Sequence, residues 1–421
     1  MNIPFLLLLE NSLTFHGVFE SEWQWGLAKN IYSGNIDHLI EIGWISVFTA
    51  TGYILASILT RGTQKQITYA LSDYRFRVLS GSSFSLLLLV CVVLIALSTP
   101  PVGILDADHG SSKPISSLVN FTSLWMISYL IFLYLIVDIF TDVKRYRKKC
   151  KTYSIILVTL WILYYAQLRT GDREFFTMLI AIFLFKYFIL KSVFTEHGRF
   201  QFITLGRKIS VSSILMLTVI SILMLVIFYT IGTLRSGVVG KNHMDILAHL
   251  SETDFSNIIY GTWSSALLGI QSAVVSVKVF NEQLRFGMDY FDLLISIPPG
   301  FIADIIGYER PVSSTSSVGI QLIYGLGGNH SSVVPYLNFG LFGVQFFAFF
   351  YFLGANHIEN KLKCMNAKYV FIYIAVLFAI PHWIWYGEKY IINLFIISFT
   401  ILMLQKIYIT KIYLEQTYRA S

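Results

Sequence analysis

The sequence predicts an all-α polytopic membrane protein with about nine or ten transmembrane helices and one large loop on the non-cytoplasmic side. Hydrophobic residues fill 55% of the 421 positions and charged residues only 13%, against about 25% charged residues in a typical soluble domain. Apolar stretches of roughly 20 residues, the length that crosses a bilayer as a helix, recur along the chain. Lys and Arg gather in alternate segments between these stretches, which is typical of a chain that crosses the membrane repeatedly.

Nine apolar stretches account for the predicted spans. They cover residues 39–59, 79–98, 115–140, 152–168, 174–191, 209–232, 336–354, 369–386 and 389–409. Residues 1–38 form an interfacial or non-cytoplasmic segment, whose apolar start could be half of a tenth span. The predicted organisation is therefore six spans in 39–232, a large outer loop at 233–335, and three spans with a cytoplasmic tail in 336–421.

The distribution of basic residues orients these spans. Segments 61–77, 144–151, 191–208, 361–368 and 406–419 together hold 20 Lys and Arg residues, whereas the alternate segments hold 10 although they are longer. Cytoplasmic loops of membrane proteins carry the excess of positive charge. The N-terminus and the 233–335 loop are therefore predicted outside, and the C-terminus inside.

The same composition excludes other classes of protein. The net charge of +7 comes from short basic clusters between apolar stretches, which indicates membrane orientation rather than a nucleic-acid surface. We therefore expect membrane lipids and no nucleic acid as partners. The chain has three cysteines, and their spacing gives neither a disulfide framework nor a metal-binding motif.

The turn between the fourth and fifth spans concentrates charge on the predicted outer side. It reads Arg169-Thr170-Gly171-Asp172-Arg173. Guanidinium groups bind phosphate oxygens through paired hydrogen bonds, and a neighbouring carboxylate can orient them or act as a base. The turn therefore predicts an anion-binding site with Arg169 and Arg173 as cations and Asp172 as the orienting group or base. A solvated turn whose charges only end the two helices is the alternative.

The 233–335 loop is long enough to be functional rather than a simple connection. Arg235 and Arg285 add positive charge on the same side and predict further contacts to an anionic substrate, although each alone is as compatible with an interfacial anchor. Tyr290 and Tyr324 could stack on sugar rings. The chain holds 34 Phe and 25 Tyr residues, however, so lipid-facing bulk is an equally ordinary role for either ring.

His330, near the end of this loop, is a candidate general acid or base, because an unperturbed imidazole has a pKa near ~6.5. The alternative is a loop histidine that is either solvated or satisfied inside the protein core. A role in catalysis requires that the ring reach the proton that it transfers.

No cofactor is predicted. Asp106, Asp108 and His109 stand together after the second span and could hold a divalent ion, but such a short loop is also ordinary turn chemistry. The glycines at 325–328 match neither a dinucleotide-binding nor a P-loop pattern. We therefore expect neither a metal nor another cofactor.

Four features follow one another along the chain. They are the arginine-bearing turn 169–173 between two short spans, a large outer loop opening near Arg235, Gly287-Met288-Asp289-Tyr290 followed by Ile297-Pro298, and Asn338-Phe339-Gly340-Leu341-Phe342-Gly343. In this order they resemble the O-antigen polymerase (Wzy) family, also called oligosaccharide repeat-unit polymerases, across about residues 35–410. Many relatives carry a glutamate at the position of Val334, so no carboxylate role is carried over there.

The resemblance implies a GT-C-like membrane fold in the bacterial inner membrane, with the outer loop in the periplasm. It implies a glycosyltransferase that joins undecaprenyl-pyrophosphate-linked oligosaccharide repeat units into O-antigen or a related surface polysaccharide. The growing chain would be the donor, and the terminal sugar of a new unit the acceptor. Chain-length control would involve a regulator protein as a partner.

Two other functions share part of this pattern. An O-antigen ligase would use the same kind of lipid-pyrophosphate donor and a large outer loop, but would transfer the glycan to a lipid A core. A transporter of lipid-linked oligosaccharides usually has repeated halves and charges at mid-membrane. Here no internal repeat is visible and the charges gather outside the spans, so a transporter is disfavoured.

Overall fold

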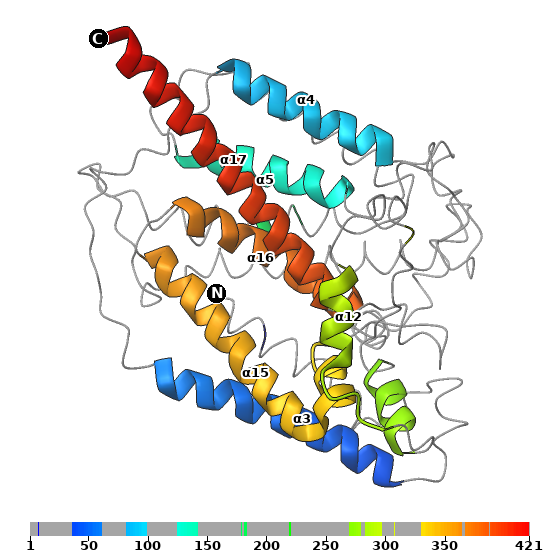
Figure 1. Ribbon diagram of the computed structural model, residues 1–421. Coiled ribbons are helices and arrows are strands. Elements are labelled where there is room, and N and C mark those ends of the chain that lie inside the picture. The colour runs from blue at the N-terminus through cyan, green and yellow to red at the C-terminus, as the bar shows by residue number, and fades with distance from the viewer. Residues whose placement is uncertain are drawn as a thin grey trace. The chain divides into compact units, whose positions relative to one another are not determined.

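The structure is a computed structural model of the chain. It describes residues 36–60, 81–98, 124–141, 269–278, 283–296, 330–363, 367–386 and 388–420, with single positions at 7, 178, 181–182, 219 and 307. Figure 1 shows these parts as coiled ribbons. Within them the regular elements are all helices, and no strand occurs. The all-α class predicted from the sequence is therefore confirmed for the described part of the chain.

Seven helices define the described part. They are α3 (Ile36–Thr60), α4 (Gly81–Ser98), α5 (Leu124–Thr141), α12 (Met288–Ser296), α15 (Val333–Lys363), α16 (Ala367–Tyr386) and α17 (Glu388–Ala420). Six of them overlap predicted spans, and α12 lies within the predicted outer loop. The predicted spans 152–168, 174–191 and 209–232 lie almost entirely outside the described residues.

Three of the described helices are long and apolar enough to cross a membrane, over Ile40–Thr60, Val333–Lys361 and Tyr390–Ile407. Most of their outward-facing positions are apolar, as lipid contact requires. Examples are Trp44, Ile54 and Leu59 on α3 and Phe399, Met403 and Ile407 on α17. The described helices are thus those of a membrane protein.

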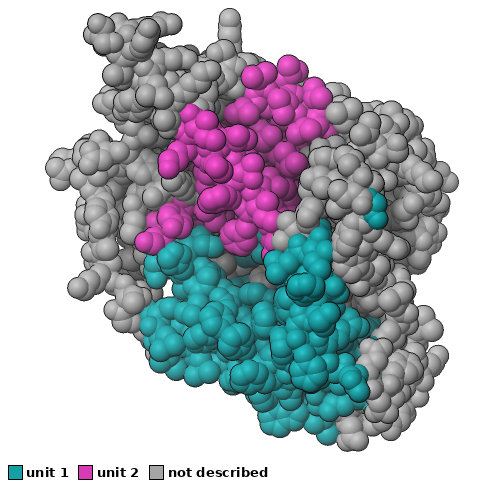
Figure 2. Space-filling model, viewed as in Figure 1, with its two compact units in different colours: residues 1–66, 205–360, 379–391 teal, residues 67–204, 361–378, 392–421 magenta. Residues whose placement is uncertain are grey.

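The chain divides into two compact units, coloured in Figure 2. The first comprises residues 1–66, 205–360 and 379–391, and the second comprises residues 67–204, 361–378 and 392–421. All the contacts of the candidate site lie in the first unit. Its hydrophobic core joins α3, helix 269–278 and the start of α15 through Ile45, Val274 and Tyr336, among others.

In the first unit, α3 and α15 approach each other closely at Gly52. A Cβ atom at this position would lie 2.6 Å from the backbone oxygen of Gln345 and 2.9 Å from Cβ of Ala348. Next to this contact, the rings of Tyr53 and Phe352 stack with centroids 5.3 Å apart. Small residues at such crossings let helices pack in lipid, where van der Waals contact replaces the hydrophobic effect between helices.

Polar side chains also link α3 to α15. The hydrogen-bonded pairs are Glu41 with Tyr336 (2.9 Å), Thr51 with Gln345 (3.4 Å) and Thr60 with Asn356 (3.1 Å). Residue numbers rise together along the three pairs, so the two helices run parallel, as Figure 1 also shows. The predicted topology sends spans 39–59 and 336–354 across the membrane in the same direction, and the parallel pair agrees with it.

In the second unit, α4 packs on α5 through a small polar contact. The Ser128 hydroxyl donates to the Cys91 carbonyl at 3.0 Å, and the Cys91 thiol lies 3.3 Å from the Ser128 carbonyl. The Cys91 thiol is buried and unoxidised. These bonds satisfy two polar side chains inside an apolar contact.

Candidate functional site

Three of the eight predicted site residues lie in the described part of the chain: Arg285, Tyr290 and His330. All three belong to the first unit. The other five, Arg169, Asp172, Arg173, Arg235 and Tyr324, lie outside the described residues, so their roles stay predictions. The acidic group at 106–109 lies outside them too, and the described part holds no cluster of three or more His, Cys, Asp or Glu that could bind a metal.

The segment before α12 is anchored on α15 by its backbone. The Arg285 amide donates to the Leu337 carbonyl, and the Phe286 amide donates to the Asn338 carbonyl, both at 3.0 Å. Phe286 (φ 46°) and Gly287 (φ 91°) then turn the chain through the left-handed region into α12. Glycine adopts this conformation without steric cost, which explains the residue at 287.

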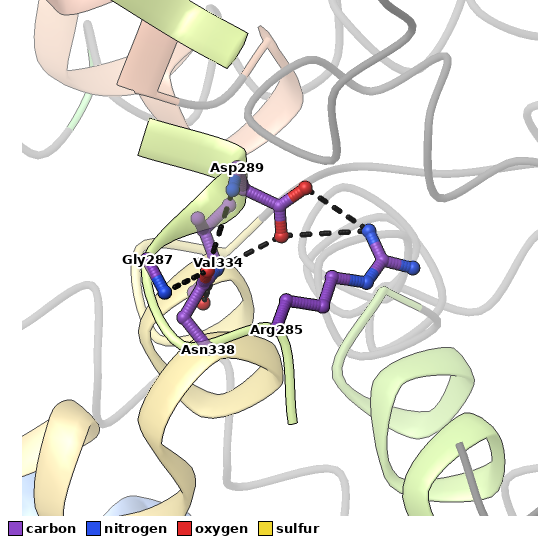
Figure 3. Close-up of polar contacts among 5 residues, drawn as sticks. All are labelled: Arg285, Gly287, Asp289, Val334 and Asn338. Carbon is purple, nitrogen blue, oxygen red and sulfur yellow. Dashed lines mark hydrogen bonds and ion pairs between the residues drawn. The ribbon is translucent and has the colours of Figure 1, made fainter. Parts of the chain in front are cut away.

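Asn338 holds this turn in place with its side chain, as Figure 3 shows. Its Oδ1 accepts from the amides of Gly287 at 2.9 Å and Asp289 at 3.4 Å. Its Nδ2 donates to Oδ2 of Asp289 at 2.8 Å and to the Val334 carbonyl at 2.9 Å. The side chain is fully buried. One residue of the Asn-Phe-Gly segment thus caps α12, about fifty positions earlier in the sequence.

Arg285 forms an ion pair with Asp289. Its NH1 lies 3.0 Å from Oδ1 and 3.4 Å from Oδ2 of the carboxylate. The Asp289 side chain is only 4% exposed, while that of Arg285 is 36% exposed. Asp289 therefore holds the guanidinium at the protein surface, and a diphosphate would have to share this cation with a buried carboxylate.

Gly340 and Gly343 explain the shape of α15. Gly340 has φ 63° and ψ −153°, which breaks the helix into two parts. A Cβ at Gly343 would lie 2.5 Å from the Pro335 carbonyl oxygen and 2.6 Å from Cβ of Phe339. The spacing Gly-x-x-Gly thus permits a sharp bend followed by close backbone approach. This bend sets the Asn338 side chain beside α12.

Tyr290 belongs to an aromatic cluster that joins α12 to the second part of α15. Its ring stacks on Phe347 with centroids 4.7 Å apart and planes 3° apart, and it lies 6.5 Å from the ring of Phe339. Burial raises the pKa of its phenol above the ordinary value. A sugar could not stack on the face that Phe347 covers, so the substrate contact predicted for Tyr290 would need another part of the side chain.

His330 is buried at the start of α15, where it caps the helix. The Ser332 amide donates to its Nδ1 at 3.2 Å, and the Ser332 hydroxyl lies 2.7 Å from the same nitrogen. Both of these contacts of Nδ1 lie within the turn that opens α15. These contacts hold the ring inside the protein, and the general acid or base role of His330 stays a prediction.

Sequence reasoning nominated neither Asn338 nor Asp289 as a site residue, and it overlooked Glu388. Asn338 and Asp289 stood inside the segments used for the resemblance, but only the fold shows that these segments meet. Glu388 is buried at the start of α17, where Oε1 accepts from the Tyr351 hydroxyl at 3.3 Å. The sequence did hold a signal for Glu388, since an acidic residue stands directly before an apolar helix there.

Burial raises the pKa of Glu388 from its ordinary value of 4.5 to about 8, and the nearby Asp289 carboxylate adds to this effect. The folded state therefore keeps a proton that the unfolded state releases near pH 4.5, and stability falls as the pH rises from that value to about 8. Replacing Glu388 with Gln should remove this loss. Melting temperatures of both proteins should then differ little near pH 5 and more at high pH, with the variant the more stable. An equal difference at both pH values would contradict a buried, protonated Glu388.

The chain matches no protein-family profile, no curated protein and no solved structure.

Proposed function

We propose that this protein polymerises undecaprenyl-pyrophosphate-linked oligosaccharide repeat units at the outer face of a bacterial inner membrane. The observation that carries the proposal is the order of the four segments, two of which, 287–290 and 338–343, are hydrogen-bonded to each other through Asn338. These are the segments that resemble the Wzy family. If the two segments form one site, this explains why both occur in the same chain.

The proposed reaction is glycosyl transfer. A hydroxyl of the acceptor sugar attacks the anomeric carbon of the donor chain, and the bond from this carbon to the lipid pyrophosphate breaks. The proton passes to a base, for which Asp172 and His330 are the candidates; His330 is buried, and its Nδ1 accepts from the Ser332 amide. Arginine side chains would stabilise the charge that develops on the leaving pyrophosphate without a metal.

A strain that lacks the gene tests the proposal. Mass spectrometry of its lipid-linked glycans should show single repeat units in place of polymer, and the wild-type gene should restore the polymer. Retention of lipopolysaccharide capped with one unit would separate a polymerase from an O-antigen ligase, whose loss removes all capping. Failure of any repeat unit to reach the outer face would favour a transporter instead.

Arg285 offers a separate prediction because its structural and chemical roles can be separated. Arg285→Ala leaves the buried Asp289 carboxylate without its cation and should destabilise the protein by about 1–3 kcal/mol. The double variant Arg285→Ala/Asp289→Asn should regain most of this stability, as melting temperatures would report. Its polymerisation rate should nevertheless stay lower, on the order of 100-fold, if the guanidinium contacts pyrophosphate.

The single variant Asp289→Asn is the control that keeps the arginine; because its new amide nitrogen must face either the Arg285 guanidinium or Nδ2 of Asn338, its activity is compared per amount of folded protein. It should retain more polymerisation than the double variant at equal protein levels. A double variant that is both stable and fully active would exclude Arg285 from the substrate site.

A further inference from the structure

Helix α12 departs from the pattern expected for a helix in water. Met288, Phe291 and Leu294 are exposed, whereas the buried residues are Leu293 and the polar Asp289 and Ser296. A helix on the surface of a soluble loop places its charged and polar residues outward. The environment of the outward face of α12 is therefore apolar.

The exposed residues form one continuous face. The exposed positions 288, 291 and 294 fall within an arc of about 120° on a helix of 3.6 residues per turn. The half-buried Ile295 lies within the same arc, so all four side chains there are apolar. Asp292 lies at the edge of this arc and is half-buried. An uninterrupted apolar arc bordered by a polar residue is typical of helices that lie in a membrane interface.

Phe286 extends this face ahead of the helix. Its side chain is 76% exposed, and its backbone φ of 46° is unusual for a residue with a side chain. Glycine would relieve the strain at this position. A bulky apolar ring held outward in a strained conformation indicates that the ring itself has a partner outside the chain.

The segment that carries this face is hydrogen-bonded to α15, a helix long and apolar enough to span a membrane. Ring contacts lead from Tyr290 to Phe347 at 4.7 Å, from Phe347 to Phe346 at 5.7 Å, and from Phe346 to Phe342 at 6.1 Å. Phe342 and Phe346 are themselves exposed. Figure 1 shows α12 beside the first part of α15. Helix α12 is therefore attached directly to a helix whose outward rings, Phe342 and Phe346, are exposed as those of a lipid-facing helix are.

We propose that α12 lies in the membrane interface, with Phe286, Met288, Phe291 and Leu294 inserted among lipid acyl chains. The 233–335 segment would then be partly a membrane-embedded element rather than wholly a water-exposed loop. This proposal does not depend on the proposed function, because it rests only on the exposed apolar side chains of α12.

Single cysteines on the apolar face of α12 and at a polar position ahead of the helix test the proposal. Phe291→Cys and Leu294→Cys lie on the apolar face, and Gln283→Cys is the control, an exposed polar position just ahead of α12. Each is made in the full-length chain with Cys91, Cys150 and Cys364 replaced by alanine, checked by size exclusion. The proteins are reconstituted in phosphatidylethanolamine and phosphatidylglycerol vesicles.

A water-soluble maleimide should label the two face positions at least about tenfold more slowly than Gln283→Cys, because an apolar environment raises a thiol pKa by a unit or more. A fluorophore attached at these positions should be quenched by lipids with a spin label on the acyl chain. Labelling as fast as at the control position, without quenching, would overturn the proposal. Disulfide-linked dimers through Phe291→Cys, again without quenching, would assign the face to a second copy of the chain instead.

Discussion

Replacing Gly340 with alanine is expected to destabilise the first unit and to lower the amount of folded protein in the membrane. The φ of 63° and ψ of −153° at this position fall in a region that is open essentially to glycine alone. Forcing a side chain into it costs on the order of 1–3 kcal/mol, or else straightens α15 and moves Asn338 away from α12. The melting temperature, followed by size exclusion with fluorescence detection, is the measurement.

Two further glycines of α15 provide a second test and a control for this prediction. Gly343→Ala should also destabilise, for a different reason, since its Cβ would lie 2.5 Å from the backbone oxygen of Pro335. Gly354→Ala is the control, because it meets nothing within 4 Å and has an ordinary φ. It should be neutral or stabilising by up to about 1 kcal/mol. Equal effects of the three alanines would show that the bend does not depend on glycine.

Replacing Asn338 with aspartate should be about as severe, although the two side chains have the same shape. The change removes the Nδ2 donor and sets a carboxylate oxygen against Oδ2 of Asp289, at a separation near the present 2.8 Å. Two buried acceptors then face each other, and the loss is about 3 kcal/mol or more. Folded protein should be scarce, and the melting temperature should fall well below that of the wild type.

An exchange of the two side chains should rescue this variant in part. In Asn338→Asp/Asp289→Asn, the new amide at 289 can donate to the new carboxylate at 338, so one donor faces one acceptor again. Asn356→Asp is the control on the same helix, since the Thr60 hydroxyl that it meets can turn and donate to a carboxylate. No gain in melting temperature for the exchanged pair would mean that the contact in Figure 3 does not fix α12 on α15.

Much of the fold could be predicted because length and hydropathy suffice for helices in lipid. The predicted spans 39–59, 369–386 and 389–409 coincide closely with α3, α16 and the start of α17. The bend in α15 was not predictable in the same way, because a glycine inside an apolar run has no unique meaning until its dihedral angles are known. The prediction for 336–354 therefore found the helix, but neither its start at residue 333 nor its break at Gly340.

The site could be predicted only as a set of residue types. Arg285 was nominated for its charge, but Asp289 was not recognised as its partner, although a pair four residues apart is within reach on a helix turn. His330 was nominated for its pKa, yet the hydrogen bond from the Ser332 amide gives its ring a capping role. Contacts over fifty positions, such as that of Asn338 with Gly287, leave no periodic signal in one sequence.

Reconstitution of the purified protein with lipid-linked repeat units is the most direct test of the proposed function. Full-length protein in liposomes would receive undecaprenyl-pyrophosphate-linked repeat units as the sole substrate, and mass spectrometry would follow the products. Polymerisation predicts lipid-linked glycans that grow by whole repeat units, with one undecaprenyl pyrophosphate released for each bond formed. Folded protein that leaves the single units unchanged would contradict the proposed function. Arg169→Ala and Arg173→Ala variants should make no long glycan, and normal product from both would remove these two arginines from the site.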